Sequence, residues 1–163
     1  MMAGSHVIVG AALWAVTAKL SGGTPADIPA LAGAAMGALL PDMDHPQSWA
    51  GRKFRPISVP LSLVVGHRGV THSLLAVVAG IVALAAMGLD GAVAPVVLGY
   101  LSHLAADSLT PSGVPLLWPM KHRFSLNLCR TGSVTEMGVV ALIALAGGWA
   151  TGVDFSHLPR PKF

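Results

Sequence analysis

The stretch "SLLAVVAGIVALAAMGL", residues 73–89, is the most membrane-like part of this 163-residue chain. It contains no Asp, Glu, Lys or Arg, and its small residues are interspersed with branched apolar ones. A segment of this length and composition predicts a helix that crosses a bilayer. The turn "GLDGA" (residues 88–92) ends it, so the chain is expected to reverse direction there.

Apolar segments on either side of this stretch predict four more helices. They are expected at about residues 7–19, 28–40 and 93–108, and from about residue 134 onward. Most are shorter than the ~20 residues that span a bilayer comfortably. They are also rich in Gly and Ala, which favours close helix–helix packing. The expected fold is all-α: a compact, membrane-embedded bundle of about five short, tilted helices.

The composition supports a membrane protein. Charged residues make up 10% of the chain and hydrophobic residues 53%, whereas a soluble domain carries about 25% charged residues. The alternative is a soluble all-helical protein with an unusually apolar core. We expect one domain at residues 1–158 and a flexible tail at 159–163. The formal charge of +3 does not indicate nucleic acid, because the basic residues do not alternate with aromatic ones.

Two segments between the helices carry most of the basic residues. Residues 46–65 contain three prolines and the cluster Arg52, Lys53 and Arg55, which is typical of an excursion at the surface or the membrane interface. Residues 110–133 are expected to form a long loop with three further basic residues, Lys121, Arg123 and Arg130.

The acidic and histidine side chains are not spread evenly over the predicted bundle. If the helices alternate in direction, nine of them lie at the same end: His6, Asp42, Asp44, His45, His67, His72, His103, Asp107 and Glu136. The turns at the opposite end contain little besides Lys19, Asp27 and Asp90. Ionisable groups near lipid are costly unless they pair or bind a cation. The shared end therefore predicts a metal site.

Spacing and chemistry suit this site to zinc. His103 and Asp107 are four residues apart, so on a helix they lie on one face and can bind one ion. Zinc accepts imidazole nitrogen together with carboxylate oxygen, and several carboxylates would suit two or three ions. Ordinary roles stay open for single residues: a polar helix terminus for His6, and a capping partner of Ser133 for Glu136. His122 and His157 are expected to lie outside the site.

Five motifs extend this interpretation to a known family. In order along the chain they are "SH" (5–6), "LLPDMDH" (39–45), "HRGVTHS" (67–73), "HLAAD" (103–107) and "TGSVTE" (131–136). Together they resemble the YdjM-like family of inner-membrane-associated, metal-dependent hydrolases, which is distantly similar to zinc-dependent phospholipase C. The resemblance implies metal-site roles for His6, Asp42, Asp44, His67, His72, His103, Asp107 and Glu136. His45, which follows the aspartates, is a further candidate.

The expected activity is hydrolysis of a phospholipid or another lipid-linked phosphoester by metal-activated water. Asp42 or Asp44 would position or deprotonate the water. Arg68 would bind a phosphate oxygen, although contact with a lipid headgroup or a carboxylate fits it equally well. Two functions of other classes stay open: transport or sensing of a divalent metal, and a non-catalytic membrane partner with a structural metal. The number of ions, the substrate and the oligomeric state are not determined by the sequence.

The expected location is the bacterial inner membrane, with several membrane crossings. Seven of the ten Lys and Arg residues lie at the same end as the predicted site. Because cytoplasmic loops carry an excess of Lys and Arg, this end is expected to face the cytoplasm. The expected partners are membrane lipids, including an anionic, phosphate-containing substrate lipid.

Overall fold

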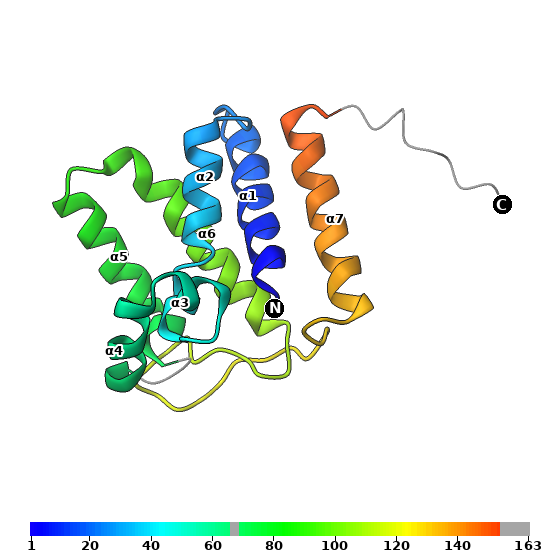
Figure 1. Cartoon of the computed structure of the whole chain (residues 1–163). Helices are drawn as coiled ribbons and strands as arrows, with labels where there is room; N and C mark the ends of the chain where they lie inside the picture. Colours follow the sequence, from blue (N-terminus) through cyan, green and yellow to red (C-terminus); the bar gives the residue numbers. More distant parts are fainter. Residues whose placement is uncertain (66–68, 154–163) are drawn as a thin grey trace.

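The computed structural model describes residues 1–65 and 69–153, and these residues form helices and loops (Figure 1). The elements are α1 (Ala3–Leu20), α2 (Ile28–Gly37), η1 (Pro41–Asp44), α3 (Trp49–Lys53), α4 (Arg55–Val65), η2 (Val70–His72), α5 (Leu74–Ala86), α6 (Asp90–Ser108) and α7 (Val134–Thr151), where η marks a short 3₁₀ helix. The predicted all-α class is confirmed. The predicted flexible tail at 159–163 lies outside the described residues.

Helices α1, α2, α5, α6 and α7 are the five helices that the apolar segments predicted. Their ends differ by a few residues from the expectation. Helix α2 ends at Gly37 rather than near Leu40, because the chain tightens there into three-residue turns in which Leu39 donates to Met36 and Leu40 to Gly37. Pro41 then begins η1, which carries both aspartates of "LLPDMDH".

Glycines allow α2 and α6 to pack at close backbone distance. A Cβ atom on Gly99 of α6 would lie 1.9 Å from the carbonyl oxygen of Ala34, and one on Gly37 would lie 2.1 Å from that of Val96. Small residues that permit such approach are typical of helix pairs in membranes. Helix α1 packs against α2, α6 and α7, and α5 packs against α6.

Two helices, α1 and α7, are long and apolar enough to cross a membrane. Of these helices, 39% of α1 and 22% of α7 is buried within the protein, so α7 in particular turns apolar surface outward. Helix α5 is a shorter apolar helix whose outer face exposes Leu75, Val78 and Val82. These outward faces suit contact with hydrocarbon better than contact with water.

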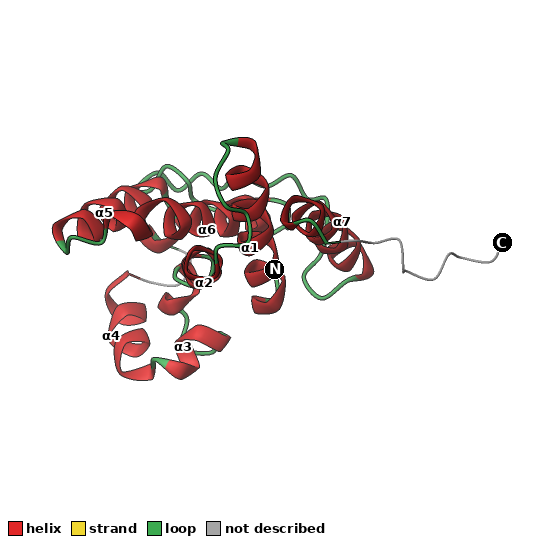
Figure 2. Ribbon diagram, turned by 90° about the horizontal axis from the view of Figure 1, so that it is seen from above, coloured by secondary structure: helices red, strands yellow, loops and turns green. Residues whose placement is uncertain are grey.

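The segment expected to be an excursion folds into α3 and α4. Ser48 starts α3, because its hydroxyl accepts a hydrogen bond from the backbone of Gly51 at 2.8 Å. Pro56 lies in the first turn of α4, where a missing backbone N–H has no helical partner to lose. Figure 2 shows α3 and α4 lying to one side of the row formed by α5, α6 and α7.

The helix ends nearest the predicted site all lie at one end of the bundle. In Figure 1 the start of α1, the ends of α2 and α6, and the starts of α5 and α7 lie at the bottom of the view. The loop between α6 and α7 runs across this end, where Leu126 donates to Ser108 at 2.7 Å and Leu74 donates to Leu116 at 2.9 Å. The structure therefore brings the predicted segments to a common end.

Candidate metal centre

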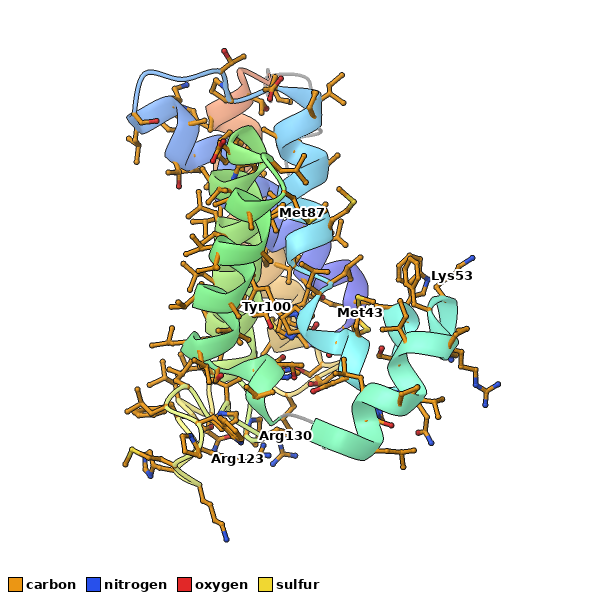
Figure 3. All side chains as sticks on the ribbon, turned by 90° about the vertical axis from the view of Figure 1, so that its left-hand side faces the viewer. Met43, Lys53, Met87, Tyr100, Arg123 and Arg130 are labelled. Atoms are coloured by element: carbon orange, nitrogen blue, oxygen red, sulfur yellow. The ribbon has the colours of Figure 1, made fainter. Side chains whose placement is uncertain are left out.

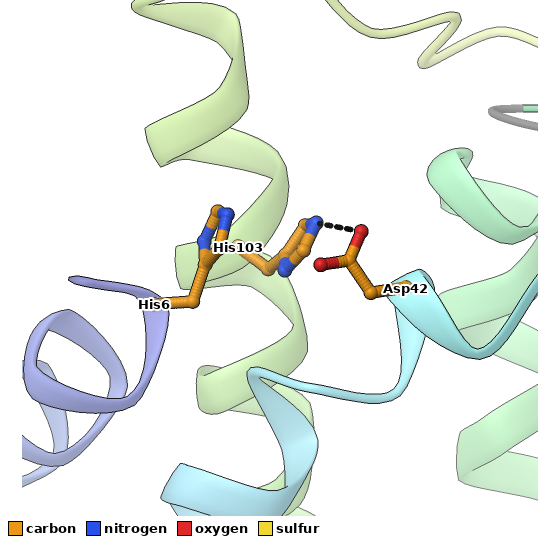
Figure 4. A group of neighbouring side chains, drawn as sticks. All are labelled: His6, Asp42 and His103. Carbon is orange, nitrogen blue, oxygen red and sulfur yellow. Dashed lines mark ion pairs between the residues drawn. The ribbon is translucent and has the colours of Figure 1, made fainter. Parts of the chain in front are cut away.

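Three histidines and two aspartates from four separate segments converge at this end of the bundle. One group is His6, Asp42 and His103, and a second is His72, His103 and Asp107. Within each group, one ligand atom per residue lies within 4.8 Å of the others. Figure 4 shows His6 and His103 side by side, with Asp42 facing His103. The two groups share His103, which places this residue at the centre of the site.

A hydrogen bond at Nδ1 fixes the orientation of the His103 ring. Its Nδ1 lies 2.7 Å from the carbonyl oxygen of Ala38, and since a carbonyl only accepts, the proton must be on Nδ1. The lone pair of the neutral ring is then on Nε2, which lies 3.9 Å from Asp42 and 3.7 Å from Asp107. This buried Nε2 has no hydrogen-bond partner within the described parts of the chain. The ring is therefore oriented as a metal-binding histidine would be.

A carboxylate lies behind His72 in the same way. Nδ1 of His72 lies 3.5 Å from an oxygen of Asp44, whereas Nε2 faces Asp42 at 3.9 Å and Asp107 at 4.0 Å. The same Asp44 oxygen accepts a hydrogen bond from the hydroxyl of Thr71. Asp44 thus supports His72 from the side away from the ligand atoms, and it belongs to neither ligand group.

His6 completes the wall of the site on the α1 side. Its ring stacks on that of His103, with ring centroids 3.7 Å apart and an interplanar angle of 14°. Its Nε2 lies 3.3 Å from Asp107 Oδ1, the oxygen that also accepts from the amino group of Met1. His6 is therefore held between an aromatic contact and a carboxylate.

Glu136 is fully buried, but its carboxylate accepts hydrogen bonds from the backbone rather than facing the histidines. Its Oε1 accepts from the backbone of Met2 at 2.8 Å, and its Oε2 accepts from the backbone of Gly132 at 2.7 Å. The predicted N-cap of α7 is confirmed, because Ser133 accepts from the backbone of Glu136. Glu136 ties the start of α1 to the start of α7. It is outside both ligand groups, and its ligand role remains a prediction.

Burial shows where the site can be reached. His6, His72, His103 and Asp107 are at most 1% exposed, whereas the side chain of Asp42 is 17% exposed. Asp42 is thus the member of the cluster that meets the surroundings. Three imidazoles and several carboxylates in a buried space form a donor set that a divalent cation would neutralise.

The remaining predicted residues lie at the margin or outside the description. His67 and Arg68 lie outside the described residues, as does His157. His45 is half-buried at the end of η1 and is in neither ligand group. His122 is exposed and packs edge-on against Phe124, so its position away from the cluster agrees with the expectation.

Two residues of the site were missed by sequence reasoning. The hydroxyl of Tyr100 donates to the carbonyl oxygen of Thr71, whose own hydroxyl donates to Asp44. This chain of hydrogen bonds connects α6 to the support of His72. The spacing of Tyr100, three residues before His103 on the same helix, was a usable indication, because residues three apart share a helix face.

Comparisons with known proteins identify the same family as the sequence motifs. A family model described as "YdjM inner membrane protein" matches residues 1–158. Proteins named inner membrane protein YdjM from Escherichia coli (strain K12) and Shigella flexneri are each 51% identical over 94 residues, which is 54% of this chain and 48% of theirs. The chain thus spans about half the length of these curated relatives.

A third relative matches over a longer range. The uncharacterized protein YvsG of Bacillus subtilis (strain 168) is 38% identical over 144 residues, which is 87% of this chain and 89% of that protein. No solved structure matches the chain.

Proposed function

Because the chain belongs to the YdjM inner membrane protein family, we propose that it is a membrane-bound, metal-dependent hydrolase that cleaves a phosphoester of a membrane lipid. One observation carries this proposal. His72 and His103 are each held at Nδ1, by Asp44 and by the Ala38 carbonyl, and both present Nε2 to Asp42 and Asp107. Metal-binding histidines are oriented in this way in proteins.

The donor set fits zinc. Imidazole nitrogens from His6, His72 and His103 combine with carboxylate oxygens from Asp42 and Asp107, and zinc accepts both ligand types. The two groups share His103, whose single free nitrogen can bind only one ion, so a second or third ion would require ligands beyond these five residues. Bound zinc would supply hydroxide at neutral pH and polarise a phosphoryl oxygen.

The two neighbouring aspartates would have different roles in the reaction. Asp42 is partly exposed and lies at the entrance to the cluster, where it can accept a proton from an attacking water. Asp44 is fully buried between Thr71 and His72, so it is better placed to hold the His72 ring than to meet a substrate. Arg68, which lies outside the described residues, remains the candidate contact for a phosphate oxygen on sequence grounds.

The surroundings of the site suit a lipid substrate. A cavity of about 200 Å³ lies between α5 and α6, and its apolar lining includes Leu40, Val77 and Gly80. It also includes Tyr100, whose hydroxyl contacts the Thr71 segment of the site. Figure 3 shows Arg123 and Arg130 at the same end of the bundle, where they can attract an anionic headgroup. One molecule with a hydrocarbon chain and a phosphate would match both features.

The proposed location is the bacterial inner membrane with several crossings and the metal centre at the cytoplasmic face. The segments 46–65 and 110–133 contribute six Lys and Arg residues to the site end of the chain, which the positive-inside rule assigns to the cytoplasm. A transporter would need its ligands near the bilayer midplane, whereas this cluster lies at helix ends. Its position therefore favours hydrolysis over transport.

The decisive experiment measures metal and turnover in the same samples. The protein is purified in detergent, its bound metals are quantified, and phospholipid and other phosphodiester substrates are assayed. We expect stoichiometric zinc in the unmodified chain, and a loss of turnover of about 10²–10⁴-fold in Asp42→Asn. The matched control is Asp90→Asn, an exposed carboxylate at the other end of the bundle.

Each outcome has a separate meaning. If the purified protein binds no stoichiometric metal, the metal centre is wrong. If metal is present but no phosphoester is hydrolysed, the cluster is a structural metal site of a membrane protein. Filling the cavity tests the lipid substrate: Gly80→Leu should raise KM for long-chain substrates, whereas Gly138→Leu on α7 should not. A Cβ atom at either glycine meets open space, so both variants are expected to fold.

A further inference from the structure

Helices α3 and α4, which we call the insert (residues 49–65), stand apart from the packed helices. The insert is in contact mainly with η1, the element that carries Asp42 and Asp44. Figures 1 and 3 show it projecting sideways from the site end of the bundle. A side chain on its outer surface therefore does not reach the bundle core.

The outer surface of the insert exposes large apolar side chains. Phe54 is 52% exposed, Ile57 55% and Leu63 82%, whereas Trp49 faces the start of α1 across a pocket that Ala3 and Val7 also line. Phe54 lies between α3 and α4, and Ile57 lies in the first turn of α4. A concentration of exposed aromatic and branched side chains of this kind marks a contact surface with another molecule or a membrane.

The charged residues of the same surface are all basic. Arg52, Lys53 and Arg55 are all exposed, and residues 46–65 contain no Asp or Glu. Figure 3 shows Lys53 on the side of the insert that faces away from the bundle. Cations interleaved with aromatic and aliphatic side chains on a short helix are typical of segments that lie in the membrane interface. The charge is complementary to an anionic leaflet.

We infer that the insert lies in the headgroup layer of the membrane and binds anionic phospholipids. The apolar side chains enter the boundary with the acyl chains, and Arg52, Lys53 and Arg55 contact lipid phosphates. The position at the end of the bundle fits this depth, because α1 and α7, which are long and apolar enough to cross a bilayer, begin at the same end. The inference needs no bound metal and no catalytic activity, so it can fail independently of the proposed hydrolase.

Contact of the insert with the leaflet also fixes the depth of Asp42 relative to the lipid headgroups. The hydroxyl of Ser48, which caps the insert, donates to the carbonyl oxygen of Asp42 at 2.7 Å. A Cβ atom on Gly51 would lie 1.9 Å from the carbonyl oxygen of His45, so the insert is packed closely on the end of η1. The partly exposed Asp42 is thereby held at the depth of the lipid headgroups.

The test places a fluorescent label on the insert in nanodiscs. Ile57→Cys is labelled with an environment-sensitive thiol fluorophore, and Val82→Cys on the outer face of α5 serves as a deep reference. Cys129 is buried, so the unmodified chain measures background labelling. We expect nitroxide lipids labelled near the headgroup to quench position 57 more than lipids labelled near the chain end, and the reverse at position 82. Quenching of position 57 by aqueous iodide, and by neither lipid, would overturn the inference.

A second measurement tests the anionic preference. Headgroup-labelled phosphatidylglycerol is expected to quench position 57 more strongly than headgroup-labelled phosphatidylcholine. The variant R52Q/K53Q/R55Q should remove this difference, whereas K121Q/R123Q/R130Q, a matched triple at the same end, should keep it. Equal quenching by both lipids in the unmodified insert, or loss of the preference in the control triple alone, would show that the insert is not the anionic-lipid contact.

Discussion

The two ends of the helix bundle are built from the same parts, helix termini and connections, yet their ionisable residues have different partners. At the end opposite the candidate metal centre, Asp27 and Lys19 make single contacts near the surface. Asp27 accepts from the backbone of Ala30 and caps α2, and Lys19 donates to the carbonyl oxygen of Trp149 and lies 4.1 Å from the centre of its ring. These are ordinary surface interactions of modest strength.

At the site end the ionisable groups come from distant parts of the chain and are buried together. His6 and His103 stack although nearly 100 positions separate them, and Asp42 faces His103 from a third segment. Such a group is costly to bury unless a cation balances the carboxylates. The comparison teaches that position at a helix end does not by itself bring donor atoms together. Convergence with ionisable groups of other segments does.

The largest effect is expected from removing the histidine that both ligand groups share. His103→Ala deletes an Nε2 donor at the centre of the cluster, so the protein should lose its bound metal. The measurement is the metal-to-protein ratio of the purified chain by elemental analysis. His122→Ala, a change at an exposed histidine outside the cluster, should leave that ratio unchanged. Full metal occupancy in His103→Ala would mean that the cluster around His103 does not bind the metal.

A smaller effect is expected from the carboxylate behind His72. Asp44→Asn keeps the shape of the side chain but removes the negative charge that holds the imidazole, so metal affinity should fall about 10–100-fold. Competition with a chromogenic chelator measures this affinity. Complete loss of metal would instead make Asp44 a direct ligand, as the family resemblance implies. Unchanged affinity would remove it from the site.

A substitution at Glu136 distinguishes a structural role of this residue from a role as a metal ligand. In Glu136→Gln one of the two carboxylate oxygens becomes an amide group, which cannot accept from a backbone N–H. Losing one of these two part-buried hydrogen bonds should reduce stability by about 1 kcal/mol. Thermal unfolding in detergent measures the loss, with metal content followed in parallel. Normal stability with loss of metal would show that Glu136 acts as a ligand rather than as a tie.

The smallest effect is expected at the opposite end. Asp27→Ala removes the cap of α2 and should reduce stability by about 1 kcal/mol. Because the cap lies far along α2 from η1, metal content and turnover should not change. Thermal unfolding and elemental analysis of the same preparation check both statements. A loss of metal in this variant would show that the two ends are coupled through α2.

The sequence predicted the arrangement of the helices well, for a local reason. Uninterrupted apolar segments such as 73–89 form helices wherever they lie, and Gly, Pro and charged residues mark their ends. If successive helices alternate in direction, the common end of the ionisable residues follows, and the structure has this alternation across two short turns and two long connections. The helical fold of the insert was not predicted, because the three prolines in residues 46–65 favoured an irregular excursion.

Within the site, the sequence identified residue types and their shared end but not their individual roles. Asp42 and Asp44 are two positions apart and look equivalent in "LLPDMDH", yet one is partly exposed beside His103 and the other is buried behind His72. The Ala38 carbonyl that holds His103 could not be predicted, since every residue has such a group. The roles of Tyr100 and Thr71 likewise depend on the contact between α6 and η2.

What the sequence alone determined is therefore the helical class, the direction of each helix and the end at which the ionisable residues gather, because these follow from local periodicity and the length of apolar segments. The tertiary structure alone decided which side chains meet as ligand groups, which carboxylate lies behind a histidine, and which glutamate ties two helices together. These depend on distances of a few ångströms between segments far apart in the chain. Close packing, such as that of Gly99 on Ala34, sets those distances.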